Sequence, residues 1–213
     1  MEHAIVPPMG EPRRRATYDD LIAVPEHLIA EIIDGELITS PRPAPPHALA
    51  CSGILSVLFD RFNGPPGSGD PAPGGWWILY EPELHFGDDV LVPDIAGWRR
   101  DRMPALPDIA YFTLAPDWVC EVISPGSGRL DRIKKMPIYA REGVQHLWLV
   151  DPIARTVEVY RLDGDRWVVE PPPVSDAPER IAPFAAVEVD PRRWWRRGTD
   201  EAASGPPNKP TPP

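Results

Sequence analysis

Apolar and polar positions follow two different periods along the chain, and their order predicts a mixed α/β domain. Residues 18–24 show helical spacing of apolar side chains after Thr17, which has Asp20 as a capping partner three residues later. Residues 48–62 repeat the helical spacing over a longer stretch and predict a core helix. A third helix is expected over residues 130–142, where Gly143 provides the C-cap.

Strand-like segments fill much of the remaining chain. They cover residues 28–33, 36–39, 76–86, 90–98, 118–124, 146–150, 156–161 and 166–170. Turn residues join pairs of them into hairpins at Asp34-Gly35, which suits a type I′ turn, at Gly87-Asp88-Asp89 and at Asp163-Gly164. The order of elements therefore predicts an α/β fold with a central mixed β-sheet, flanking helices and β-hairpins.

Prolines mark the ends and loops of this domain. The chain has 31 of them, gathered at residues 1–12, 41–46, 65–73, 171–178 and 206–213. With 213 residues and 42% hydrophobic content, the chain is long enough for one domain with a buried core. We therefore expect a single domain over residues 17–198, a flexible N-terminal tail over residues 1–16 and a disordered, proline-rich C-terminal tail over residues 199–213.

Cysteine usage and the lack of long apolar runs favour a cytoplasmic protein. Cys51 and Cys120 lie in apolar segments 69 residues apart, and no N-terminal stretch resembles a signal peptide. No run approaches the roughly 18–20 apolar residues that a membrane-spanning helix needs. We expect reduced thiols, a cytoplasmic location and no membrane partner.

The net charge of −10 argues against a protein that binds duplex DNA through a basic surface. The expected tails carry +1 and −1, so the charge of −10 belongs to residues 17–198. Affinity for duplex DNA comes mainly from neutralising phosphates, which favours basic proteins. Bound divalent cations would reduce this acidity, and two arginine groups could form a basic rim. These groups are Arg99, Arg100 and Arg102, and Arg192, Arg193, Arg196 and Arg197.

Glu121 interrupts a strongly apolar strand, where alternation places it on the same face as Val119 and Ile123. A charged group on such a strand is costly unless something compensates it. Two structural explanations are a buried ion pair with an arginine and a half-exposed strand. The chemical explanation is that Glu121 binds a divalent metal ion.

Asp94 also interrupts an apolar strand, directly after Pro93. Alone, an aspartate after a proline is most often a turn residue or a cap. Together, Asp94 and Glu121 would offer hard oxygen ligands from two neighbouring strands, which suit Mg²⁺ or Mn²⁺. Such an ion can activate a water molecule and neutralise charge that develops on phosphorus.

Lysine is scarce in this chain, and two of its three lysines, Lys134 and Lys135, stand side by side downstream of Glu121. They point about 100° apart on a helix, so only one can face the site. Lys135 shares a helix face with Tyr139 and could position the attacking water or stabilise the transition state. A solvated lysine on an amphipathic helix is the structural alternative. Pro137 removes a helical hydrogen bond and predicts a kink near this lysine.

Two further polar residues are accessory candidates. His47 opens the long predicted helix and could be a cap, a buried hydrogen-bonded histidine or a phosphate contact. Glu31 lies near the first hairpin and could be a third acid or a surface residue. Because the chain has no glycine-rich phosphate loop, no zinc-like Cys/His spacing and no Gly-x-Ser-x-Gly motif, nucleotide-driven and zinc chemistry are disfavoured.

The candidate residues belong to a set of short motifs that occur in one order. The motifs are Glu31-Ile32-Ile33-Asp34-Gly35-Glu36-Leu37, His47, Val92-Pro93-Asp94, Glu121-Val122-Ile123-Ser124-Pro125, Asp131 with Lys135 and Tyr139, Gly143-Val144, and Leu147-Trp148-Leu149-Val150-Asp151. Over roughly residues 17–190, this order resembles the Uma2 family of endonucleases within the PD-(D/E)xK restriction-endonuclease-like superfamily.

The resemblance implies a central mixed sheet flanked by helices, with Asp94 and Glu121 as metal ligands and Lys135 as the catalytic lysine. Ile123 stands where the plainest superfamily pattern carries a lysine. In this family the lysine lies on the following helix, and Lys135 matches that place.

The sequence leaves three hypotheses for the activity. The main one is a Mg²⁺- or Mn²⁺-dependent endonuclease that hydrolyses phosphodiester bonds of DNA. The second, suggested by the acidic charge and the missing lysine at position 123, is a catalytically weak or inactive nuclease-like module that acts by protein binding. The third is hydrolysis of RNA or a small phosphodiester, which suits an acidic surface better. Because many nucleases of this superfamily cut both strands as dimers, a homodimer is expected by analogy.

Overall fold

The structure, a computed structural model, describes residues 14–67, 73–124, 128–171 and 177–195. Its strands are β1 (Leu28–Ile33), β2 (Glu36–Pro41), β3 (Trp76–Tyr80), β4 (Leu84–Phe86), β5 (Asp89–Leu91), β6 (Ile95–Arg99), β7 (Trp118–Val122), β8 (His146–Asp151), β9 (Thr156–Asp163) and β10 (Arg166–Val169). Its helical elements are α1 (Tyr18–Ile22), α2 (Pro45–Phe62), α3 (Gly128–Leu130), the π-helical turn η1 (Asp131–Lys135), α4 (Met136–Arg141) and the short 3-10 helix η2 (Pro191–Arg193). Apart from residues 14–16, both expected tails lie outside the described residues, so the domain boundaries stay predictions.

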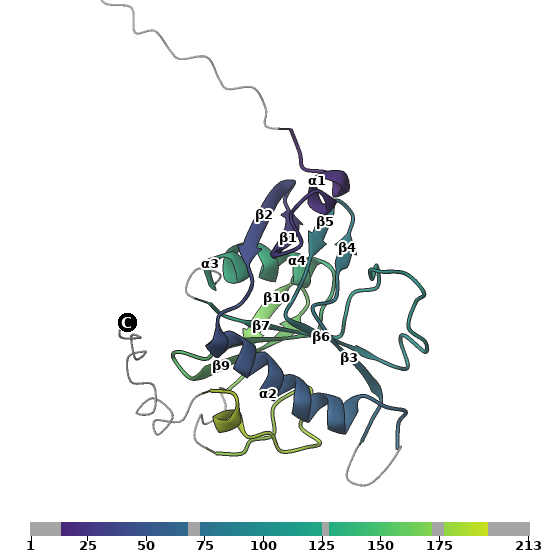
Figure 1. Cartoon of the computed structure of the whole chain (residues 1–213). Helices are drawn as coiled ribbons and strands as arrows, with labels where there is room; N and C mark the ends of the chain where they lie inside the picture. The colour runs from purple at the N-terminus through teal and green to yellow at the C-terminus, as the bar shows by residue number, and fades with distance from the viewer. Residues whose placement is uncertain (1–13, 68–72, 125–127, 172–176, 196–213) are drawn as a thin grey trace, which may run out of the picture.

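Two β-sheets organise the fold (Figure 1). The main sheet has six strands in the order β10-β9-β8-β7-β6-β3, and the second sheet has four in the order β2-β1-β5-β4. The main sheet is mixed, because β7 pairs in parallel with β8 and antiparallel with β6. The predicted α/β fold with a central mixed sheet and hairpins is therefore confirmed.

Each of the two long strands expected over residues 76–86 and 90–98 is divided between the sheets. β3 and β6 belong to the main sheet, whereas β4 and β5 leave it and pair as a hairpin in the second sheet. The breaks fall at Pro82 and Pro93, which lack the N–H group that a continuous ladder needs. Glu81 turns the chain at the first break, with a φ of 44°. The prediction of two uninterrupted strands was therefore wrong.

Helices and a C-terminal segment cover the two faces of the main sheet. α2 packs on β3 and β7 and contributes to one core cluster. Residues 181–195 cover the same face, where Phe184 packs against Trp118 and Trp148 at ring-centroid distances of 4.9 and 5.7 Å. α4 belongs to a second cluster on the opposite face, which includes Tyr139. None of the helices in the described ranges is both long and apolar enough to cross a membrane.

The helix expected over residues 130–142 is present but irregular. It consists of α3, η1 and α4, and Gly143 follows with a φ of 79°. In η1 the Met136 N–H donates to the Asp131 carbonyl oxygen, five residues earlier. Pro137 comes next and lacks an N–H group, so the π-helical turn η1 lies where the proline predicted an interruption of the α-helix.

Several local signals are confirmed. Asp34 and Gly35 both have positive φ, 55° and 79°, as a type I′ turn requires. The backbone N–H and the hydroxyl of Thr17 both donate to Asp20 Oδ2 at 2.8 Å and start α1. α2 begins at Pro45, ahead of the predicted start, because prolines fit the first turn of a helix.

Candidate active site

Asp94 and Glu121 lie on neighbouring strands at one end of the main sheet. Asp94 directly precedes β6, and Glu121 is near the end of β7. The register pairs Ile95 with Cys120, so one further step places Asp94 opposite Glu121. The Val122 N–H donates to Asp94 Oδ2 at 2.7 Å, which fixes this carboxylate against β7. The two residues predicted as metal ligands therefore occupy opposing positions on adjacent strands, and the charge of Asp94 acts on Glu121.

Lys135 is buried among carboxylates, with an exposed fraction of 4%. Its Nζ lies 2.8 Å from Glu31 Oε1, 3.2 Å from Glu121 Oε1 and 3.8 Å from Asp131 Oδ1. These acids come from β1, β7 and η1, so the ammonium joins three elements. Glu31 Oε1 also accepts the Val92 N–H at 2.8 Å. The alternative of a solvated surface lysine is therefore wrong, and Glu31 is a buried acid of the cluster.

The side chain of Lys134 points away from this acid cluster. It pairs with Glu36 of β2 at 2.5 Å, and its side chain is 32% exposed. Of the two adjacent lysines, only Lys135 lies among the buried acids, as the helical spacing predicted.

Burial shifts the pKa values of this cluster. Burial raises the pKa of Glu121 well above its usual range, although Lys135 opposes the effect. Burial acts to lower the pKa of Lys135, but Glu121, Glu31 and Asp131 outweigh it and raise that pKa. Burial also raises the pKa of Tyr139, whose hydroxyl donates to Glu121 Oε1 at 2.6 Å. The acids outnumber the ammonium, so a bound cation would stabilise their ionised forms.

His47 approaches Asp94 from α2, on the other face of the sheet. His47 Nε2 lies 3.1 Å from Asp94 Oδ1, and His47 Nδ1 lies 3.5 Å from Cys51 Sγ, one turn along the helix. One ligand atom from each of the three residues lies within 4.8 Å of the others. Because Ala44 is the N-cap of α2, the cap role considered for His47 is wrong. Asp94 thus contacts the histidine on one face, and its negative charge acts on Glu121, which faces the other side of the sheet.

Two acids near these residues, Asp131 and Glu81, were given no role from the sequence, although Asp131 was named among the motifs. Asp131 carried a usable signal, because it precedes Lys135 by four residues on one helix face. Glu81 carried none, because it lies where a continuous strand was expected. Its backbone N–H donates to the Asp94 carbonyl oxygen at 3.0 Å. Its Oε1 is buried, and no hydrogen-bond partner for it is found among the described residues.

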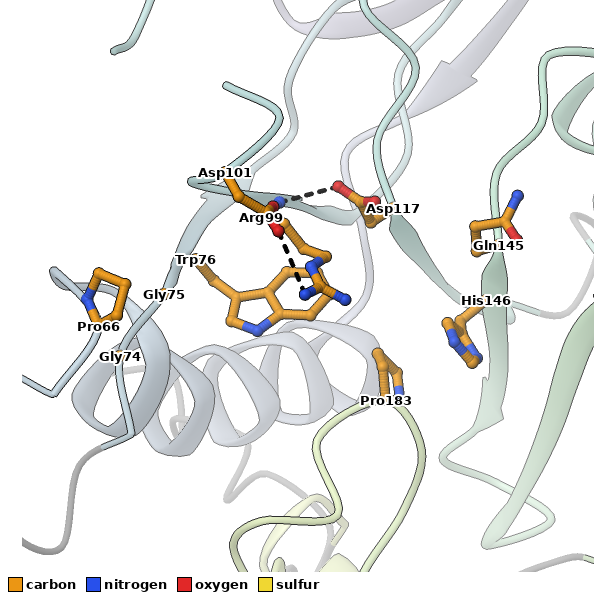
Figure 2. A pocket seen from close by; sticks show the side chains of 10 residues that line it. All are labelled: Pro66, Gly74, Gly75, Trp76, Arg99, Asp101, Asp117, Gln145, His146 and Pro183. Atoms are coloured by element: carbon orange, nitrogen blue, oxygen red, sulfur yellow. Dashed lines mark hydrogen bonds and ion pairs between the residues drawn. The ribbon is translucent and has the colours of Figure 1, made fainter. Parts of the chain in front are cut away.

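A separate cavity of about 520 Å³ opens at the opposite end of the main sheet (Figure 2). Arg99 ends β6, Asp117 precedes β7 and His146 begins β8, and all three line the cavity. Asp117 is already bound by the Arg102 guanidinium at 2.8 Å and by the Arg99 N–H at 2.8 Å. Asp101, the other carboxylate that lines this cavity, pairs with Arg99 at 3.3 Å, so both acids there are matched by arginines.

Comparison with known proteins agrees with the sequence motifs. A solved structure, described as that of "a putative nuclease belonging to DUF820" from Anabaena variabilis, shares 27% sequence identity with the chain at a TM-score of 0.63. The similarity covers 84% of this chain and 97% of that chain. No curated protein matches. Residues 15–190 match the Uma2 family, described as "Putative restriction endonuclease". The match spans most of the chain, which therefore belongs to the Uma2 family.

Proposed function

We propose that the protein is a Mg²⁺- or Mn²⁺-dependent endonuclease that hydrolyses phosphodiester bonds of DNA. The family and the structural neighbour both point to a nuclease. The observation that carries the proposal is the register that sets Asp94 opposite Glu121 on adjacent strands, together with the contact of the buried Lys135 with Glu121. Two carboxylates and an ammonium at one place are the groups that metal-assisted phosphodiester hydrolysis uses.

The residues present fit a hard divalent cation. Asp94 and Glu121 supply carboxylate oxygens, the ligand type that Mg²⁺ and Mn²⁺ prefer. Lys135 and Tyr139 both contact Oε1 of Glu121, so we assign the other oxygen, Oε2, to the ion. The neighbouring acids Glu31 and Asp131 add negative charge that Lys135 alone does not balance.

Each residue has a separate task in this mechanism. When bound, the ion would polarise the scissile phosphate and lower the pKa of a water molecule. Lys135 has two acids at hydrogen-bond distance, and its remaining N–H group would hold the attacking water in line or stabilise charge on the phosphoryl oxygens. Glu31 holds the ammonium in place and favours its charged form. Tyr139 orients the Glu121 carboxylate.

The test is cleavage of supercoiled plasmid by purified protein with Mg²⁺, Mn²⁺ or EDTA. Glu121→Gln keeps the side-chain shape but removes a charged ligand, so we expect cleavage to fall by about 100-fold or more. Glu170→Gln is the matched control, because Glu170 pairs with Arg161 beside the β9–β10 hairpin and should leave cleavage unchanged. Metal-dependent cleavage that survives in Glu121→Gln would contradict the assignment.

The same preparations test the substrate. RNA and bis(p-nitrophenyl) phosphate are assayed beside the plasmid, since the net charge of −10 favours substrates other than long duplexes. Cleavage of RNA or of bis(p-nitrophenyl) phosphate without cleavage of the plasmid would contradict DNA as the substrate. A folded wild-type protein that cuts none of the three and binds no metal would support a nuclease-like module that acts by protein binding.

A further inference from the structure

We propose that His47 is a nitrogen ligand of the metal ion, which gives the centre mixed nitrogen and oxygen donors. The inference rests on the proposed function, because it concerns the ion that Asp94 and Glu121 would hold. It adds a ligand from α2, across the sheet from the helix that carries Lys135.

The start of α2 places His47 rigidly. His47 follows Pro45 and Pro46, whose fixed φ angles suit the first turn of a helix. His47 is buried, with an exposed fraction of 7%, so its ring is held by packing before any ion arrives. A donor fixed in this way loses little conformational entropy when it binds a ligand.

The distance between His47 and Asp94 fits two ligands of one ion. Two metal–ligand bonds of about 2.1 Å at a right angle place their ligand atoms about 3.0 Å apart. His47 Nε2 and Asp94 Oδ1 are 3.1 Å apart. The His85–Glu83 contact in the same molecule is 2.7 Å, the length of a strong charge-assisted hydrogen bond. The His47–Asp94 contact is longer than the His85–Glu83 contact and has the separation expected for two ligands of one ion.

The other partners of Asp94 and His47 leave Asp94 Oδ1 and His47 Nε2, which face each other, available to the ion. Asp94 Oδ2 accepts the Val122 N–H, which turns Oδ1 toward His47. His47 Nδ1 contacts Cys51 Sγ at 3.5 Å, one turn along α2. When Nδ1–H donates to this sulfur, the lone pair of Nε2 faces Asp94. A partner for the second ring nitrogen is the usual arrangement of a metal-bound histidine.

A nitrogen ligand changes which ions the site prefers. Carboxylates alone suit Mg²⁺ and Mn²⁺, whereas imidazole favours transition-metal ions. With His47 as a ligand, the site should bind Mn²⁺ more tightly than Mg²⁺. Replacing the nitrogen by an oxygen, as in His47→Asp, should reduce the ratio of the Mg²⁺ to the Mn²⁺ dissociation constant by about 10-fold or more.

The experiment is electron spin-echo spectroscopy of the full chain with Mn²⁺ alone, without nucleic acid. Coordinated imidazole produces nitrogen modulation of the Mn²⁺ echo. We expect this modulation in the wild type and its loss in His47→Asp and His47→Gln, with Mn²⁺ still bound through the carboxylates. His85→Gln is the matched control, because it removes a histidine from another carboxylate pair and should keep the modulation.

The outcomes separate this inference from the proposed function. Bound Mn²⁺ without nitrogen modulation in the wild type would overturn the His47 assignment and leave the carboxylate site intact. Modulation that persists in a folded His47 variant would overturn it as well. A folded wild-type protein that binds no Mn²⁺ would overturn both proposals. If the His47 variants do not fold, the wild-type and His85→Gln spectra are compared, and the absence of nitrogen modulation from bound Mn²⁺ in both overturns the assignment.

Discussion

At the scale of single residues, the candidate site depends on one buried ammonium. Lys135 contacts acids from β1, β7 and η1, so the proposed catalytic group is also a link between three elements. Breaking a buried ion cluster leaves uncompensated charges inside the protein, whereas breaking a surface pair leaves charges that water solvates. The chemistry and the stability of this site are therefore coupled through one side chain.

Lys135→Met should lower the free energy of unfolding by about 3–5 kcal/mol in EDTA, because it leaves Glu31 and Glu121 without their cation. Urea unfolding measures this difference. Lys134→Met is the control and should cost less than about 1 kcal/mol, since its pair with Glu36 is partly exposed. Equal small effects in both variants would show that Lys135 does not compensate the buried acids.

The main site candidates could be found from sequence because each has a local signal. Asp94 and Glu121 interrupt apolar strands, and Lys135 lies at helical spacing from Tyr139. The contact between His47 and Asp94 could not be found this way, because it depends on how α2 packs across the end of the sheet. The structure brings these residues together, and their roles stay proposals until tested.

At the scale of elements, the hairpin turns were predictable and the sheet assignments were not. A type I′ turn is a property of two residues, which Asp34-Gly35 supplies. In residues 76–98, Pro82 and Pro93 mark the breaks in the sequence, but nothing local specifies that β4 and β5 pair in a second sheet. The packing of residues 181–195 against α2 and β7 was also missed, because this segment has neither a helical nor a strand period.

Phe184 shows that this irregular segment is part of the core. It is fully buried and its ring packs against Phe62, Trp76, Trp118 and Trp148. Phe184→Ala should lower the free energy of unfolding by about 3–5 kcal/mol, because the lost ring leaves a cavity. Phe59→Ala, on the 52% exposed Phe59 of α2, should cost less than about 1 kcal/mol. Urea unfolding checks both, and a small loss in Phe184→Ala would mean that the segment packs loosely.

At the scale of the whole molecule, acidity and metal binding are connected. A net charge of −10 repels nucleic acid and also opposes compaction of the chain. Part of that charge is concentrated at the buried acids around Lys135, where a divalent cation would act against both effects. The predicted homodimer stays a prediction.

Metal should therefore stabilise the folded chain. An ion that binds the native state alone, at about 100 times its dissociation constant, adds about 2.7 kcal/mol. For a domain of this size, that corresponds to a rise in Tm of roughly 5–10 °C. Thermal unfolding in Mn²⁺ and in EDTA measures the difference, which should largely disappear in Asp94→Asn. The same Tm in both conditions for the wild type would contradict a native metal site.

The excursion of β4 and β5 out of the main sheet bears on how this family can vary. Tyr80 of β3 pairs with Ile95 of β6, and the Glu81 N–H donates to the Asp94 carbonyl oxygen. The chain therefore leaves the main sheet and returns to it at residues that are hydrogen-bonded to each other. The register that sets Asp94 opposite Glu121 is therefore completed by the main sheet without any residue of β4 or β5. Insertions at the exposed tip of the hairpin, at Gly87 and Asp88, would leave the two acids in place, whereas changes at Leu84 or Leu91 would disturb the core that supports them.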